Sequence, residues 1–143
     1  MKKNNKKSFV ELLSEVKNKV DAFVNAWTTE SNQMCEYLKD KLNKEISFDN
    51  HTIMVMERTG LCYDIIIDGI VCWNTRWNTN TAYISRVEKL VRDGKFEEAL
   101  DEMRTSIIYL EIVKAFNKHM KEVLAKEAEK TDKVLREISS LKF

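Results

Sequence analysis

The fold is decided by residues 61–76, which read LCYDIIIDGIVCWNTR. Asp68-Gly69, in the middle of this stretch, is a strong signal for a two-residue type I′ turn, because both central residues of that turn need a positive φ angle. Such a turn fixes the pairing register and sets Ile67 opposite Ile70. The stretch therefore predicts a β-hairpin.

The register of this hairpin predicts which side chains share a face, because successive residues of a strand point to opposite faces of the sheet. Counted outward from the turn, Tyr63 is expected opposite Asn74. Trp73 and Trp77 are expected on one face, and Arg76 on the other face together with Tyr63.

Upstream of the hairpin, the apolar pattern keeps a period of two from residue 46 onward. Residues 52–57 predict a preceding strand, and residues 46–48 can pair with it through Asp49-Asn50. We expect an antiparallel β-meander of three or four strands over residues 46–77.

Before the meander, residues 8–43 predict one long helix. Ser8 is a candidate N-cap with Glu11 three residues later, as in a capping box. Apolar residues follow at alternating spacings of four and three, the form of a helical stripe: Phe9, Leu13, Val16, Val20, Phe23 and Trp27. The stripe slips out of register near residues 28–31, where a kink or a break is expected.

After the meander, the sequence predicts a helix over residues 80–93 and a very long one over 96–139. The chain contains no proline and three glycines, and Gly94 separates the two helical patterns. A helix of ~40 residues extends roughly 60 Å, more than the diameter of a domain this size. Part of the last helix therefore needs a further packing partner.

The junction between these two helices, residues 90–100, reads LVRDGKFEEAL. It resembles the inter-helix turn of a tetratricopeptide unit, in which a glycine ends one helix and an aromatic residue plus Ala-Leu begin the next. The resemblance covers about a dozen residues and no second copy follows, whereas a solenoid needs at least ~3 units. It implies a helical hairpin and no peptide-binding function.

Composition and charge narrow the class of protein. At 143 residues the chain fits a single α+β domain over residues 8–143, preceded by a basic, flexible start at 1–7. Lys and Arg total 24 against 23 for Asp and Glu, so no strong overall field attracts nucleic acid or a membrane. Because no apolar run approaches ~20 residues and no signal peptide is recognisable, we expect a cytoplasmic protein.

The sequence lacks the usual equipment of an enzyme. Its two histidines, His51 and His119, share no local motif, and no phosphate-binding glycine loop or nucleophile elbow is recognisable. Three cysteines with no close spacing argue against a disulfide framework and a zinc site. We expect a non-enzymatic protein without a metal or another cofactor.

One set of residues has the composition of a recognition site. Two tryptophans and an arginine can stack on planar groups, and asparagine both donates and accepts hydrogen bonds. The candidate ligand-binding residues are Tyr63, Trp73, Arg76, Trp77 and Asn78. A structural explanation stays open beside this one, because the tryptophans can pack the sheet against the first helix while the asparagines cap the second.

The leading hypothesis is a homo-oligomeric binding protein. In it the long helices hold the assembly together, and the junction of the meander and the second helix offers a recognition surface to a protein or small ligand. The expected oligomer-interface residues are Phe9, Leu13, Val16, Val20, Phe23, Phe116, Met120 and Val123.

Two alternatives remain open at this point. One is a small regulatory or counter-defence protein that sequesters a nucleotide-like ligand at the Trp/Arg/Asn segment. The other is nucleic-acid binding through the lysine-rich start and the basic helical positions Lys114, Lys118 and Lys121, which the near-zero net charge disfavours.

Overall fold

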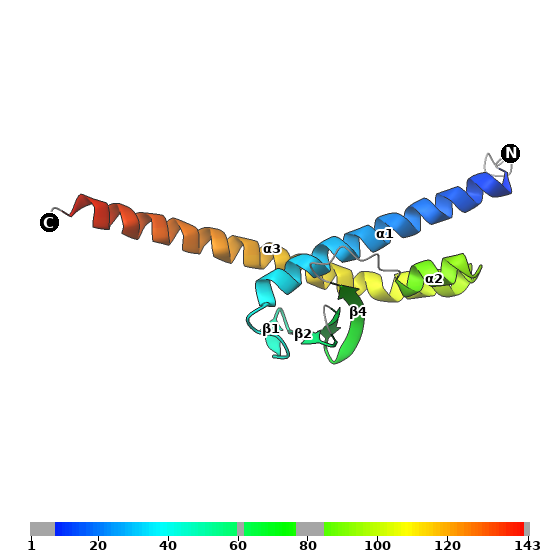
Figure 1. Ribbon diagram of the computed structural model, residues 1–143, viewed down its shortest axis with the longest axis horizontal. Helices are drawn as coiled ribbons and strands as arrows, with labels where there is room; N and C mark the ends of the chain where they lie inside the picture. The colour runs from blue at the N-terminus through cyan, green and yellow to red at the C-terminus, as the bar shows by residue number, and fades with distance from the viewer. Residues whose placement is uncertain (1–7, 60–61, 77–84, 142–143) are drawn as a thin grey trace.

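The computed structural model describes residues 8–59, 62–76 and 85–141, and it has the predicted α+β architecture (Figure 1). A long helix comes first, four strands of one sheet follow, and a short helix and a very long one end the chain. In chain order these are α1 (Phe9–Leu38), β1 (Ile46–Phe48), β2 (His51–Glu57), β3 (Cys62–Ile67), β4 (Ile70–Arg76), α2 (Arg86–Arg92) and α3 (Phe96–Ser140).

The sheet is an antiparallel meander in the order β1-β2-β3-β4. Its outer hairpin turns at Asp49 and Asn50, which have φ angles of 47° and 64°. The inner hairpin turns at Asp68 and Gly69, with φ angles of 52° and 80°. Positive φ at both central residues is what a type I′ turn requires, so the predicted turn is confirmed and the meander has four strands.

The predicted register of the inner hairpin is wrong beyond its first pairs. Ile66 lies opposite Val71 as expected, but the next pair is Ile65 with Trp73, and Tyr63 lies opposite Thr75 rather than Asn74. A β-bulge in β4 causes this shift, because an extra residue on one strand advances all later pairs by one. Trp73 consequently joins the core face of the sheet with Tyr63, and Tyr63 does not share a face with Arg76.

The first helix is unbroken through residues 28–31, and it ends at Leu38 rather than at Asn43. The Ser8 hydroxyl caps its start by accepting a hydrogen bond from the Glu11 amide at 3.1 Å, as predicted. Asn43 has a φ angle of 64°, its amide donates to the Val55 carbonyl, and its side-chain oxygen accepts from the Glu57 amide. Because Asn43 is bound to β2 in this way, the helix has to end before it.

The core lies where α1 crosses the sheet and meets α3. Trp27 of α1 stacks on Trp73 of β4, with ring centroids 5.0 Å apart and planes within 4° of parallel. Phe116 of α3 makes an edge-to-face contact with Phe48 of β1 at 5.5 Å. The tryptophan pair therefore joins helix to sheet, as the structural explanation of Trp73 expected.

The last two helices form the predicted hairpin. Ser85 and Glu88 make a reciprocal capping box at the start of α2, and Gly94 reverses the chain with a φ angle of 77°. Residues 80–84, the start of the predicted helix 80–93, lie outside the described residues. From Phe96, α3 runs without interruption to Ser140, which confirms the prediction of a very long last helix.

The body and the arm are two regions with different surroundings (Figure 1). α1 and α3 run in the same direction, and α3 continues past the sheet as an isolated helix. We call residues 124–141 the arm, and everything before them the body. Every residue of the arm is exposed. None of the described helices is both long and apolar enough to cross a membrane.

Candidate functional site

One heptad stripe runs along α3 from the body into the arm. Its residues alternate in spacing between three and four, which keeps them on one side of an α-helix. We call this stripe the seam. Within α3 it consists of Leu110, Val113, Asn117, Met120, Leu124, Glu127, Thr131, Val134 and Ile138, and Leu141 continues the spacing at the extended residue that follows the helix.

In the body the seam is covered by α1. Leu110, Val113 and Asn117 are 4%, 0% and 3% exposed. The amide nitrogen of Asn117 donates to the backbone carbonyl of Glu30 at 2.8 Å and to its carboxylate at 3.1 Å. Apolar packing and a polar clamp therefore both hold this half of the seam against α1.

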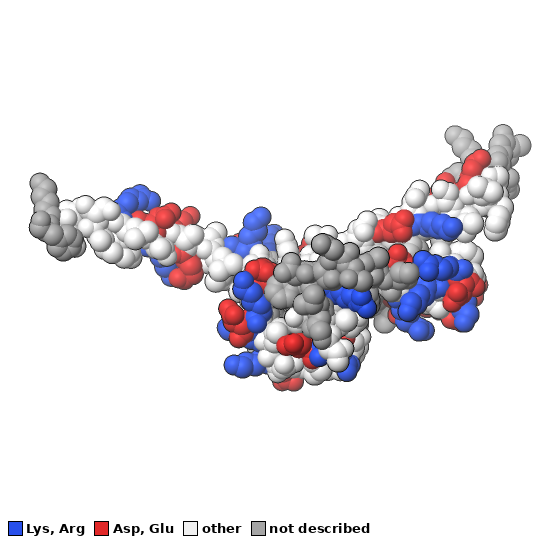
Figure 2. Space-filling view, viewed as in Figure 1, with Lys and Arg blue, Asp and Glu red and all other residues white. Residues whose placement is uncertain are grey.

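In the arm the same seam has no partner. Leu124, Val134, Ile138 and Leu141 are 50%, 51%, 50% and 59% exposed, and the neighbouring Leu135 is 54% exposed. Charged side chains of both signs lie along the arm (Figure 2). Glu127 is on the seam itself, and its carboxylate lies 3.5 Å from the ammonium group of Lys130. The arm is thus an amphipathic helix whose apolar face meets solvent.

The predicted interface residues fall into three groups. Val20, Phe23 and Phe116 are buried in the body's own core. Phe9 is 75% exposed at the start of α1. The others are half-buried: Leu13, Val16, Met120 and Val123. The apolar face of the arm extends well past these candidates, although its helical spacing was readable in the sequence.

A groove of about 420 Å³ lies between the first turns of α1 and the α2–α3 turn. Three of the interface candidates, Phe9, Leu13 and Val20, line this groove. Its apolar walls are formed by Phe9, Leu13, Val20, Val91 and Phe96.

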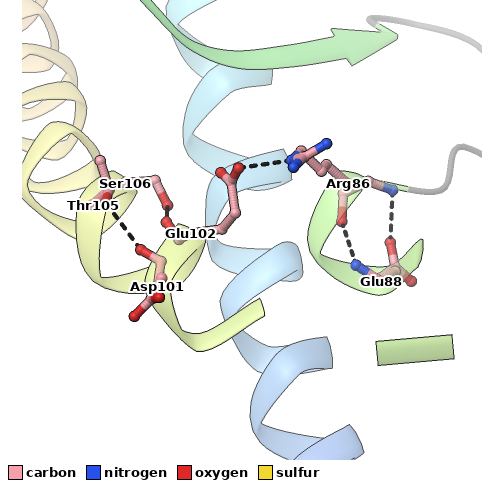
Figure 3. Close-up of polar contacts among 7 residues, drawn as sticks. Arg86, Glu88, Asp101, Glu102, Thr105 and Ser106 are labelled. Carbon is pink, nitrogen blue, oxygen red and sulfur yellow. Dashed lines mark hydrogen bonds and ion pairs between the residues drawn. The ribbon is translucent and has the colours of Figure 1, made fainter. Parts of the chain in front are cut away.

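A second groove, of about 270 Å³, lies at the junction that the sequence marked for recognition. It is bounded by β4, α2 and α3, and its polar lining includes Asn74, Arg86 and Glu102. Arg86 points across from α2 to α3, where its Nε lies 2.7 Å from the Glu102 carboxylate (Figure 3). The Ser106 hydroxyl donates to the Glu102 carbonyl at 2.8 Å. A ligand in this groove would have to compete with the ion pair for Arg86.

Beside this groove lies a buried carboxylate. Asp64 is 3% exposed, and its two oxygens accept hydrogen bonds from Arg58 and from the Asn74 amide, the latter at 2.7 Å. A buried charge is stable only when it is paired and hydrogen-bonded, and both conditions are met here. This arrangement explains Asp64 as a structural group of the sheet.

The candidate ligand residues are not brought to one face within the described part of the chain. Tyr63 and Trp73 are buried on the core face at 6% and 8% exposure. Arg76 is exposed, and it lies opposite Cys62 in the register of β3 and β4. Trp77 and Asn78 lie outside the described residues. The stacking of Trp73 on Trp27 leaves one face of its ring unavailable to a ligand.

Three titratable groups of the body have pKa values shifted by their surroundings. His51 Nδ1 lies 2.7 Å from the Asp68 carboxylate, and the Thr52 amide donates to the other carboxylate oxygen at 2.9 Å. These two contacts hold the pKa of Asp68 below its ordinary value of 3.8. Burial raises the pKa of the Cys35 and Cys72 thiols to about 12, so both stay protonated at neutral pH.

Across residues 8–59, 62–76 and 85–141, no group of three or more His, Cys, Asp or Glu side chains is placed to hold a metal ion. Comparison of the chain with family models, curated proteins and solved structures found no match.

Proposed function

We propose that this protein is a non-enzymatic, homo-oligomeric interaction protein that assembles through the arm of α3. The observation that carries the proposal is the uncovered seam, in which three apolar residues of one helical face, Leu124, Val134 and Ile138, are each about half exposed. An isolated amphipathic helix is marginal in water, and it gains most of its stability from packing its apolar face. A second copy supplies such a face.

The body keeps its own recognition surface. In the proposal, the groove beside β4 and α2 serves a further partner, either a protein or a nucleotide-like small molecule. Its lining of Asn74, Arg86 and Glu102 offers donors and acceptors at the edge of an apolar wall.

The proposal is tested by the mass in solution of the wild-type chain and of a Leu124→Lys/Ile138→Lys variant. A Lys on the seam places a charge in the paired interface, where desolvation is costly. Light scattering after size exclusion at micromolar concentrations should give at least twice 16.8 kDa for the wild type and 16.8 kDa for the variant.

A matched control places the same substitutions on the body half of α3. Leu100 and Ile108 are 45% and 65% exposed and lie off the seam. Leu100→Lys/Ile108→Lys should therefore keep the oligomeric mass. A monomeric wild type, or equal behaviour of the two double variants, contradicts the proposal.

A further inference from the structure

We infer that two copies of the chain pair antiparallel through their arms, with Leu124 of each copy facing Val134 of the other and Glu127 facing Thr131. The inference rests on the proposed function, which requires only that the arms associate. It names the partner, the direction and the register.

The seam has the period of a coiled coil. Leu110, Asn117, Leu124, Thr131 and Ile138 repeat every seven residues, and a second series offset by three contains Val113, Met120, Glu127, Val134 and Leu141. In an antiparallel pair of helices, residues of one series face residues of the other. From Met120, just before the arm, to Ile138 the seam spans 19 residues, or about 28 Å of helix.

One antiparallel register matches every layer of this seam. When Leu124 faces Val134, Met120 faces Ile138 and Glu127 faces Thr131. Apolar residues then meet apolar residues, and the one polar layer sets the Glu127 carboxylate beside the Thr131 side chain, whose hydroxyl donates within its own helix to the Glu127 carbonyl at 2.9 Å. The arrangement is two-fold symmetric, so each match occurs twice, as in an isologous interface.

A parallel, in-register pair would be disfavoured for two reasons. It sets each residue against its own copy, so the Glu127 carboxylates of both chains would face each other in the interface. In addition, the seam that continues into the body is covered by α1 up to Asn117. Two bodies at the same end would therefore need both α1 helices in the space where the α3 helices meet.

Continuity with the packed half of the seam supports pairing of the arm with another helix, and the match of layers described above sets the direction of that helix. In the body the stripe already packs on a helix, and the side-chain nitrogen of Asn117 donates there to Glu30. In the antiparallel pair the partner's arm continues where α1 ends. The bodies then lie at opposite ends of a two-helix connector.

The direction is tested by disulfide formation between arms. The background carries Cys62→Ser and Cys72→Ser, and it keeps Cys35, which is 0% exposed. Leu124→Cys and Val134→Cys chains are prepared separately and oxidised alone or as an equal mixture. In the inferred register, identical positions lie ten residues, or about 15 Å, apart along the axis. Disulfides need Cα atoms within about 7 Å, so only the mixture should give covalent dimers.

A second pair, Met120→Cys with Ile138→Cys, repeats the test at another layer, and the mass of each variant is measured before oxidation. If the chains are dimeric and a single cysteine variant cross-links on its own, the antiparallel register is wrong. The same holds if the chains are dimeric and the mixture gives no covalent dimer. Either result leaves the proposed function standing. A monomeric background chain overturns both.

Discussion

The two halves of α3 have the same apolar spacing and opposite surroundings. In the body the seam is buried against α1, and in the arm its leucines, isoleucine and valine are about half exposed. The difference teaches that helical periodicity identifies the apolar face of a helix, whereas the length of the neighbouring helix decides how much of that face is covered. α1 ends at Leu38, and α3 continues alone.

The sharpest way to break this comparison is to make one substitution in each half. Leu110 and Leu124 are the same residue type at equivalent seam positions, at 4% and 50% exposure. Leu110→Ala should lower the free energy of unfolding by about 2–5 kcal/mol, because it leaves a cavity under α1. Leu124→Ala should change it by no more than about 0.5 kcal/mol in the monomer.

Urea unfolding, at a dilution where the chain is monomeric, measures both values. At higher concentrations Leu124→Ala should show an additional loss, since the dimer interface then contributes to stability. Equal costs for the two substitutions in the dilute sample would show that the halves of α3 do not differ as described.

Two polar residues of the seam allow the same comparison with a smaller expected change in the free energy of unfolding. Asn117 and Thr131 are again equivalent seam positions, one clamped to Glu30 and the other exposed on the arm. Asn117→Ala should cost about 1–2 kcal/mol, because two hydrogen bonds to α1 are lost in a buried setting. Thr131→Ala should be close to neutral in the dilute chain. A neutral Asn117→Ala in the same urea assay would contradict the role of the clamp.

The smallest effect is expected from the sheet, where the turn at Asp68 should contribute an acid-sensitive part of the stability. The pKa of Asp68 is lowered by His51 and the Thr52 amide, so its ionised form favours the folded chain. This stability is present above pH 3.8 and is lost as the pH falls through the lower folded value. Asp68→Asn, which suits the left-handed turn conformation, should flatten this part of the profile.

Urea unfolding at neutral pH and near pH 3 compares the wild type, Asp68→Asn and His51→Asn. Both variants should lose less stability on acidification than the wild type. Combining the two substitutions should change this loss little further, because the two side chains act as a pair. If Asp68→Asn loses as much stability on acidification as the wild type, the acid-sensitive stability comes from other groups.

Much of the fold was predictable because its signals are local. Asp68-Gly69 and Asp49-Asn50 specify turns through their own backbone preferences. Ser8 specifies a helix start because its hydroxyl accepts a hydrogen bond from the amide three residues later. The length of α3 followed from the absence of breakers between Phe96 and Ser140.

The predictions that were wrong depend on contacts between residues far apart in the sequence. The bulge in β4 lets Trp73 reach Trp27, which is 46 residues away in the sequence, and strict alternation gives no sign of it. The end of α1 depends on the bonds of Asn43 to β2. Likewise, spacing alone could not reveal that Val20 and Phe23 are buried within the chain, whereas the arm is uncovered.

The stacked tryptophans have a consequence for spectroscopy. All three tryptophans precede α2, and residues 124–141 contain no aromatic side chain. Intrinsic fluorescence and near-ultraviolet dichroism are therefore blind to the arm, whereas far-ultraviolet dichroism records every turn of helix. Melting of the arm and loss of the core can thus be followed as two separate optical signals in a single unlabelled sample.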